Sequence, residues 1–344
     1  MKKHILSLDQ KELGEWLISI GEAPFRGRQI FSWIYSNFTL DPGEMKTLPA
    51  ALRSRLAQDF ITLSSKIPGK EVSDDQTEKL LVQLHDGNAV ESVVIRLKDS
   101  VSFCISTQVG CPVKCFFCAS GADGLERNLE DFEITEQFIY SCRIISAKPD
   151  NIVFMGIGEP LMNYSNLMSS VKTICDPAKF AVSPRKITIS TSGFVPGILK
   201  LAKEGMPLNL AISLHAPDDK IRSRLIPPKF RYGIDEIGKA AEKYLESTGR
   251  IVTLEYVLLD GINESQECAS ELAKFAKRIR AKINIIPYNP NPSLDFKAPN
   301  SAKTAIFEEK LRESNVPFTR RVRRGSSVNA ACGQLRRHAA DGRK

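Results

Sequence analysis

From residue 151 onward, short apolar runs alternate with amphipathic runs, and this alternation constrains the fold more than any other feature of the sequence. Strands that alternate with helices build a parallel sheet. The repeating units are too few to close an eight-stranded barrel. We therefore expect an α/β fold with an open, partial (βα)6 TIM-like barrel. The predicted strands are 151–155, 186–190, 209–213, 251–258, 282–286 and 318–322, and the predicted helices include 134–145, 166–174, 234–246 and 267–279.

The first 65 residues carry three short helical patterns of a different kind. Ser7 can cap the first helix and Gly21 can end it, while the third begins near Thr47 with Pro49 in its first turn. Basic residues between these helices suit a small RNA-binding domain. The alternative is a packing domain whose arginines only face water.

A β-hairpin is predicted between the helical part and the barrel. Residues 79–84 and 89–97 alternate in polarity around the turn Asp86-Gly87-Asn88. We therefore expect three domains: 1–75 as a helical RNA-binding domain, 76–100 as a hairpin extension, and 101–344 as the catalytic core.

Charge and hydropathy narrow the functional classes. Lys and Arg together exceed Asp and Glu by eight, which favours an anionic partner such as nucleic acid. No apolar run approaches the ~18 residues that a membrane-spanning helix needs. The N-terminal residues carry no apolar stretch with a cleavage site, so we expect a cytoplasmic protein without a membrane partner.

Three closely spaced cysteines are the strongest chemical signal. Cys111, Cys115 and Cys118 have the spacing C-x3-C-x2-C. Three thiolates on a tight loop can ligate three irons of one [4Fe–4S] cluster and leave the fourth iron open. An open iron can bind the amino and carboxylate groups of S-adenosylmethionine (SAM), whose reductive cleavage yields a 5′-deoxyadenosyl radical. The alternative is a zinc site, for which Cys104 would have to supply a fourth ligand.

A series of ordered motifs around these cysteines resembles the RlmN/Cfr family of radical SAM RNA methyltransferases, over nearly the whole chain. The motifs are PFRGRQIFSWIY (24–35), FCASG (117–121), RNL (127–129), MGIGEPL (155–161), STSG (190–193), SLHA (213–216), IPYNP (286–290) and AACGQL (330–335). The resemblance implies SAM contacts from residues that follow or end the predicted strands. These are Gly158, Glu159, Ser190, Ser213, Leu214, His215 and Asn289. Without the resemblance, each serine could equally be a helix cap, and His215 a structural histidine.

The resemblance also implies a covalent route with two further cysteines and one carboxylate. Cys332 would receive a methyl group from one SAM, and a second SAM would supply the radical that activates it, which makes two per turnover. Cys104 would release the product by forming a disulfide with Cys332, and Glu91 would accept a proton. The residues alone leave other interpretations open: Cys104 as a buried strand cysteine, Cys332 as a tail thiol, and Glu91 at a solvent-facing edge of the hairpin.

The implied reaction is methylation of C2 of a specific adenosine in 23S rRNA, which can extend to tRNA. Methylation of C8 of the same nucleotide is the alternative, and a non-catalytic Fe–S RNA-binding protein is a third. The implied partners are RNA and an electron donor such as flavodoxin or ferredoxin. The protein itself is expected to be a monomer. Arginines bracket Cys332, as 320, 321, 323 and 324 before it and 336 and 337 after it. The family usually has an acidic residue shortly before the tail cysteine, whereas this chain has Ser326-Ser327-Val328-Asn329.

Overall fold

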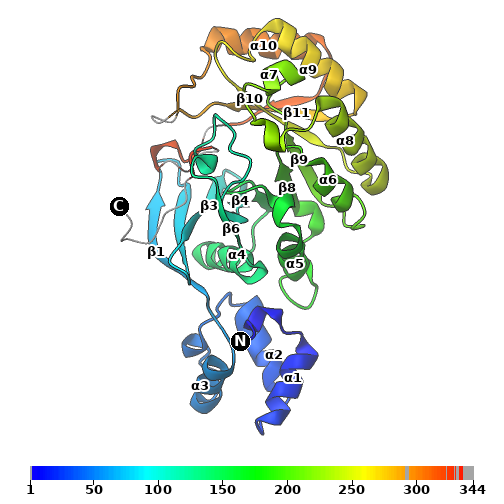
Figure 1. Cartoon of the computed structure of the whole chain (residues 1–344). Coiled ribbons are helices and arrows are strands. Elements are labelled where there is room, and N and C mark those ends of the chain that lie inside the picture. The colour runs from blue at the N-terminus through cyan, green and yellow to red at the C-terminus, as the bar shows by residue number, and fades with distance from the viewer. Residues whose placement is uncertain (1, 291–293, 323, 329, 331–332, 336–344) are drawn as a thin grey trace.

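The computed structural model describes residues 2–290, 294–322, 324–328, 330 and 333–335. Three helices form a separate lobe at the N-terminus: α1 (Gln10–Ser19), α2 (Arg26–Tyr35) and α3 (Ala50–Asp59) (Figure 1). Asp9, not Ser7, caps α1, because the Asp9 side chain accepts from the Glu12 amide at 2.7 Å. Ser7 instead ends a short 3-10 turn and donates to the His4 carbonyl. Pro49 precedes α3 rather than lying within its first turn.

The predicted parallel sheet is confirmed, with one additional strand. The strand β4 (Ser100–Cys104) pairs in parallel with β7, so it precedes the six strands that the sequence predicts. The parallel strands run in the order β4, β7 (Asn151–Phe154), β8 (Ile187–Thr191), β9 (Asn209–Ser213), β10 (Thr253–Leu258), β11 (Lys282–Pro287) and β12 (Phe318–Arg320). The crossovers contain α4 (Asp131–Ile145), α5 (Tyr164–Cys175), α6 (Val195–Leu201), α8 (Ile234–Thr248), α9 (Gln266–Arg278) and α10 (Ser301–Glu313).

Sequential neighbours pair throughout this part of the sheet, and the helices line its outer side (Figure 1). The sheet stays open, because β12 is one edge and an antiparallel strand is the other. The partial barrel is therefore confirmed. Since all seven parallel strands point the same way, their carboxyl ends meet at one rim, where functional residues of such folds gather.

The hairpin extends the sheet beyond β4. The strands β2 (Glu78–Leu84) and β3 (Ala89–Leu97) match the predicted pair, and Gly87 in their turn has φ of 85°. A further strand, β1 (Ser65–Val72), pairs with β2. Val93 lies opposite Cys104 in the β3–β4 register. Since Glu91 is two residues before Val93, Glu91 and Cys104 share one face of the sheet.

Buried contacts attach the helical lobe to the core. Tyr35 of α2 contacts Phe180, which in turn contacts Phe138 of α4, each with ring centroids 4.9 Å apart. His4 stacks on Phe132, and its Nε2 lies 3.0 Å from Oε1 of Glu136. Among the described residues, no helix has the length and apolarity to cross a membrane.

Candidate active site

The three closely spaced cysteines lie on a loop that closes tightly on itself. It follows β5 (Gln108–Gly110), which pairs with β6 (Leu125–Asn128). Gly110 has φ of 76°, and a Cβ atom there would lie 1.8 Å from the Gly124 carbonyl oxygen. A Cβ atom on Gly121 would lie 2.9 Å from the Lys114 backbone. Glycine at these two positions therefore lets the backbone fold around the three cysteines.

Cys111, Cys115 and Cys118 line one cavity at the carboxyl rim. Burial raises the pKa of Cys111 to about 12, so its thiol is protonated at neutral pH unless a metal displaces the proton. In the described part of the chain, no three His, Cys, Asp or Glu side chains converge on a single metal ion. A [4Fe–4S] cluster needs no such convergence, because each thiolate binds a different iron. Cys104 lines a neighbouring cavity instead.

Most of the strand-end residues predicted to contact SAM line the same cavity as the cysteines. They are Gly158, Glu159, Ser190, Ser213, His215 and Asn289. Leu214 is fully buried, and its backbone amide donates to the Glu255 carbonyl at 3.1 Å. Residues far apart in the sequence are thus brought together because each follows or ends a parallel strand.

Glu159 is held inside the protein by backbone donors. Its Oε2 accepts from the Ser192 amide at 2.7 Å and its Oε1 from the Leu161 amide at 3.2 Å. Burial raises its pKa above the ordinary value. Gly158 has φ of 117°, and a Cβ atom there would lie 2.8 Å from the Thr107 hydroxyl.

The donor set next to Glu159 fits a polar ligand. Ser190, Thr191 and Ser192 line the cavity beside it, so their hydroxyl and backbone groups can bond the polar groups of SAM. The carboxylate of Glu159 suits the ammonium group of SAM.

His215 is a neutral, structurally fixed residue at this cavity. Its Nδ1 accepts from the Val257 amide at 3.1 Å, and its ring meets Phe117 of the cysteine loop at 4.9 Å. Burial, together with the charge of Arg222, lowers the pKa of His215 to about 3. The Val257 bond therefore leaves the proton on Nε2, where it can be donated but not accepted.

A second cavity adjoins the first and is lined by Cys104. The two cavities share Met155, Ile286, Pro287, Asn289 and Arg321. Glu91 is buried, with 3% of its surface exposed, so the alternative of a solvent-facing hairpin residue is wrong. Its Oε1 lies 3.1 Å from Nζ of Lys79, itself buried, and that Nζ lies 3.4 Å from Oε2 of the exposed Glu71.

The residues on either side of Cys332 contact both the cysteine loop and the cavities. Gly333 accepts from the Ala119 amide at 2.9 Å, and Leu335 accepts from the Ser120 hydroxyl at 2.7 Å. Gly333 lines the first cavity and Ala330 the second. Cys332, Arg323, Asn329, Arg336 and Arg337 lie outside the described residues.

Sequence reasoning did not assign two residues of this rim, Glu255 and Tyr288, and it placed a third, Arg321, only among the arginines near the tail cysteine. Glu255 is buried at the first cavity, where its Oε2 accepts from the Asn284 side chain at 2.8 Å and burial raises its pKa. A lone carboxylate inside the predicted strand 251–258 was the available signal. Arg321 and Tyr288 line the same cavity, next to predicted residues.

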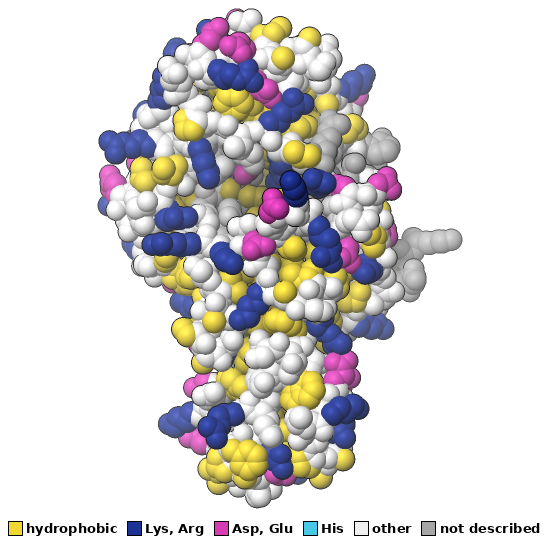
Figure 2. All heavy atoms as spheres, turned by 180° about the vertical axis from the view of Figure 1, so that it is seen from behind, with side chains coloured by type: hydrophobic (Ala, Val, Ile, Leu, Met, Phe, Trp, Pro, Cys, Tyr) yellow, Lys and Arg dark blue, Asp and Glu magenta, His cyan; other side chains and the backbone are white. Residues whose placement is uncertain are grey.

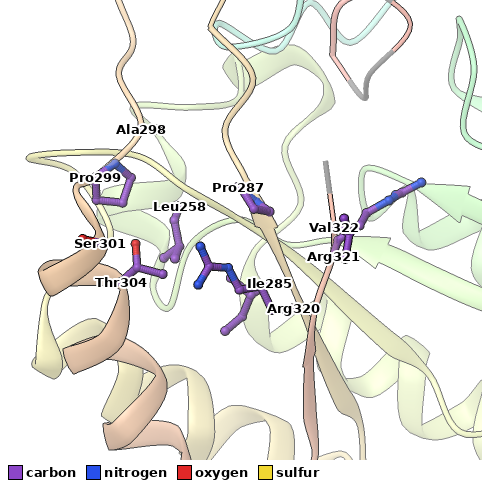
Figure 3. Close-up of a pocket in the computed structure, with 10 residues that line it drawn as sticks. All are labelled: Leu258, Ile285, Pro287, Ala298, Pro299, Ser301, Thr304, Arg320, Arg321 and Val322. Carbon is purple, nitrogen blue, oxygen red and sulfur yellow. The ribbon is translucent and has the colours of Figure 1, made fainter. Parts of the chain in front are cut away.

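Arg320, the last residue of β12, and Arg321, which follows it, point to opposite sides. Arg320 faces a third cavity between the sheet and α10, where it lies 3.4 Å from Glu308 (Figure 3). Arg321 also lines that cavity, but its side chain extends to the other side of the chain from Arg320 (Figure 3), and its Nη1 lies 3.9 Å from the Met155 sulfur. On the face seen in Figure 2, Lys and Arg side chains are spread over both lobes, with acidic side chains between them.

Comparisons with known proteins agree with this architecture. The family model of the radical SAM superfamily matches residues 105–274, and that of the ribosomal RNA large subunit methyltransferase N-terminal domain matches residues 3–61. A probable dual-specificity RNA methyltransferase RlmN from Rhodopirellula baltica is 42% identical, covering 99% of this chain and 92% of its own. The one from Syntrophomonas wolfei is 41% identical, covering 97% of each chain.

A solved structure extends the similarity to the fold. The crystal structure of a radical SAM methyltransferase from Sphaerobacter thermophilus has a TM-score of 0.91 and 40% identity, covering 97% of this chain and 99% of that one. The superfamily implies a [4Fe–4S] cluster and SAM, which the cysteine loop and the rim residues fit. The chain therefore belongs to the RlmN family of the radical SAM superfamily.

Proposed function

We propose that this protein methylates C2 of a specific adenosine in 23S rRNA, and of an adenosine in tRNA, through a methylated cysteine. One observation carries the proposal. The cavity with the three loop cysteines and the strand-end residues adjoins a second cavity with Cys104, and Asn289 lines both. Radical generation and product release can thus take place next to each other. The names of the RlmN relatives support RNA as the substrate.

The cofactors would be held by the residues at the first cavity. Cys111, Cys115 and Cys118 would ligate one [4Fe–4S] cluster, and Glu159 would pair with the ammonium group of SAM. When bound, the cluster and SAM supply a 5′-deoxyadenosyl radical. Gly158, Ser190, Ser213, Leu214, His215 and Asn289 would orient SAM through the closely approaching backbone and polar groups of this rim.

Three residues would carry the methyl group and release the product. Cys332 takes a methyl group from one SAM, and loss of a hydrogen atom to the radical from a second makes that carbon reactive toward C2 of adenine. Glu91 accepts the proton that C2 then loses. The Cys104 thiolate attacks the Cys332 sulfur, so a disulfide forms as the sulfur–carbon bond breaks. The released carbon would take up a proton and stay on the RNA as the methyl group, and the one surplus electron of the adduct would return to the oxidised cluster.

The rest of the chain would bind the RNA. We assign residues 1–75 to RNA binding, 76–100 to the hairpin that carries Glu91, and 101–344 to the catalytic core. The arginines near β12 would contact phosphates beside the cavities, which makes binding dependent on salt. A monomer in the cytoplasm would receive electrons from flavodoxin or ferredoxin.

Nucleoside analysis of a deletion strain tests this function. Mass spectrometry of digested 23S rRNA and tRNA is expected to show loss of 2-methyladenosine and its return with the wild-type gene. A Cys332→Ala gene should not restore it, whereas Cys175→Ala, outside both cavities, should. Loss of 8-methyladenosine instead would favour the C8 reaction. Unchanged methylation, with no 5′-deoxyadenosine from the reduced protein, would favour an RNA-binding protein.

A further inference from the structure

Among the described residues, Arg222 has the largest fully buried side chain, and 0% of its surface is exposed. It ends the short helix α7 (Asp219–Arg222), which follows β9. An arginine is almost never fully buried unless something compensates its charge, because removing a guanidinium from water is costly. The environment of Arg222 therefore needs an explanation.

The hydrogen-bond partners of Arg222 are carbonyl groups of the cofactor rim. Its Nη1 donates to Leu214 at 2.7 Å and to Ser213 at 3.4 Å, and its Nη2 donates to Ser192. Its Nε has no hydrogen-bond partner within the described ranges, and the negative charges that act on its guanidinium are those of an ionised Cys115 and, to a smaller extent, Asp219. Carbonyl dipoles satisfy donors, but they do not neutralise a full charge.

The segment with Arg222 packs against the cysteine loop. The Phe116 amide donates to the Leu225 carbonyl at 3.0 Å, and Val113 packs in one apolar cluster with Leu225 and Ile226. The charge of Arg222 also acts on Cys115, where it opposes the increase in pKa that burial and the neighbouring cysteines cause. The arginine is thus electrostatically coupled to the loop that would hold the cluster.

We infer that Arg222 is the buried counter-cation of the three-cysteine cluster site and raises the reduction potential of the cluster. This inference rests on the cluster ligation proposed above. Three thiolates make the site anionic, and a one-electron reduction adds a further negative charge. A fixed positive charge nearby stabilises the reduced state more than the oxidised state, and net charge and exposure set such potentials. Arg222 would act as a positioning residue, because it also ties together the loops with Ser192 and Ser213.

An anaerobic redox titration with dithionite, followed by EPR of the reduced cluster, tests this role. Arg222→Gln keeps a hydrogen-bonding side chain but removes the charge. Its midpoint potential should become more negative by about 59 mV or more, which corresponds to about a tenfold change in the reduction equilibrium for one electron. Arg222→Lys keeps the charge and should stay close to wild type at neutral pH.

Arg250→Gln is the matched control. Arg250 is a partly buried arginine that donates to Asn209, at the opposite end of β9 from the cavity, and its Nε also has no partner within the described residues. Its replacement should leave the potential unchanged. A glutamine variant of Arg222 with full cluster content and the wild-type potential would overturn the inference.

The lysine variant decides the question if the glutamine variant does not assemble a cluster. Lysine, unlike arginine, can lose its charge at accessible pH. The potential of Arg222→Lys should therefore fall below that of wild type as pH rises, and a constant difference would refute the role. The readout needs no RNA, so a different RNA product would leave it intact. A wild-type protein without an EPR signal would instead contradict the cluster itself.

Discussion

The Oδ2 atom of Asp75 lies 3.0 Å from the amide nitrogen of Gly325, although 250 residues separate them in the sequence. Asp75 lies in the loop between β1 and β2, and its Oδ1 accepts from the Thr77 amide at 3.1 Å. Burial works to raise the pKa of Asp75, but hydrogen bonds from Ser73, Thr77 and Gly325 outweigh it and hold the pKa at about 2. The β1–β2 hairpin thus fixes the start of the tail segment, residues 325–335.

Replacing Asp75 with alanine should impair RNA methylation while cluster content and SAM cleavage persist. A hydrogen bond to a charged group contributes about 1.5–3 kcal/mol, and its loss would release the tail segment from the hairpin. The measurement is the ratio of methylated RNA to 5′-deoxyadenosine per enzyme. Asp74→Ala, at the exposed neighbouring position, is the control and should keep the wild-type ratio.

The same anchor should not depend on pH in the neutral range. The folded-state pKa of Asp75 lies below its ordinary value, so its stabilisation is complete above that value and is lost only as pH falls toward about 2. The ratio for Asp75→Ala, divided by the ratio for wild type at the same pH, should be low and constant between about pH 6 and 9. Equal ratios for the two proteins would contradict the anchoring role.

Glu91 and Lys79 form a buried pair whose two members should both matter for turnover. A positioned base contributes about 10²- to 10⁴-fold, so Glu91→Gln should reduce methylation by at least about a hundredfold. Lys79→Met withdraws the nearby cation and should reduce it as well, while Lys79→Arg should retain more activity. Single-turnover methylation of RNA by protein that already carries methyl-Cys332 measures the steps that include proton transfer to Glu91.

The control for this pair is Lys70→Met in the neighbouring strand β1. Lys70 pairs with Glu78 at 2.7 Å and is exposed, so its loss should have little effect. If Glu91→Gln methylates RNA at the wild-type rate, another group accepts the proton.

SAM affinity should weaken as pH falls through the raised pKa of Glu159. Burial keeps this carboxyl protonated at pH values where an exposed glutamate is ionised, and only the ionised form pairs with the SAM ammonium group. Glu159→Gln should bind SAM about 10- to 150-fold more weakly, which corresponds to a charge-assisted bond of about 1.5–3 kcal/mol. Anaerobic calorimetry of the reconstituted protein measures the SAM affinity of wild type and variant and its dependence on pH. The variant and wild type having the same pH dependence would exclude this contact.

Glu136 should be a main anchor of the helical lobe. It accepts from His4 Nε2 at 3.0 Å, from the Ser64 amide at 2.8 Å and from the Ser65 hydroxyl. Glu136→Ala would leave these buried donors unsatisfied and should lower the free energy of unfolding by about 3–5 kcal/mol. Chemical denaturation measures the loss. Glu15→Ala, which removes an exposed pair with Lys11, should change stability by less than about 0.5 kcal/mol. Similar losses in the two variants would refute the anchor.

The sequence predicts the barrel well because its strands are short apolar runs between amphipathic helices. The bounds of β9 and β3 match the predicted ranges, since turn residues flank both runs. The strand β4 is harder to recognise as parallel, because it follows a hairpin directly. Asp9 rather than Ser7 caps α1 because the reciprocal bond with Glu12 selects it, and both residues are acceptable caps by type.

The residues behind the site could not be predicted from local patterns. Arg222 has the sequence pattern of an ordinary helical arginine, and only its tertiary packing against the segments that follow β8 and β9 makes it buried. The burial of Glu91 likewise depends on the register of β3 with β2 and β4. Motifs thus identify groups that touch a cofactor, whereas the groups that hold these in place depend on tertiary contacts.

The division of labour among the cysteines is the central claim, and a Cys104→Ala variant tests it most directly. Without the Cys104 thiol, the bond between Cys332 and the adenine carbon cannot be resolved. Incubation with 23S rRNA, SAM and reductant should therefore trap a covalent protein–RNA adduct. Digestion and mass spectrometry should locate it on the Cys332 peptide as a methylene-linked adenosine. Cys142→Ala, buried in α4, should give free methylated RNA. Free methylated RNA from Cys104→Ala as well, or an adduct on another residue, would contradict the account.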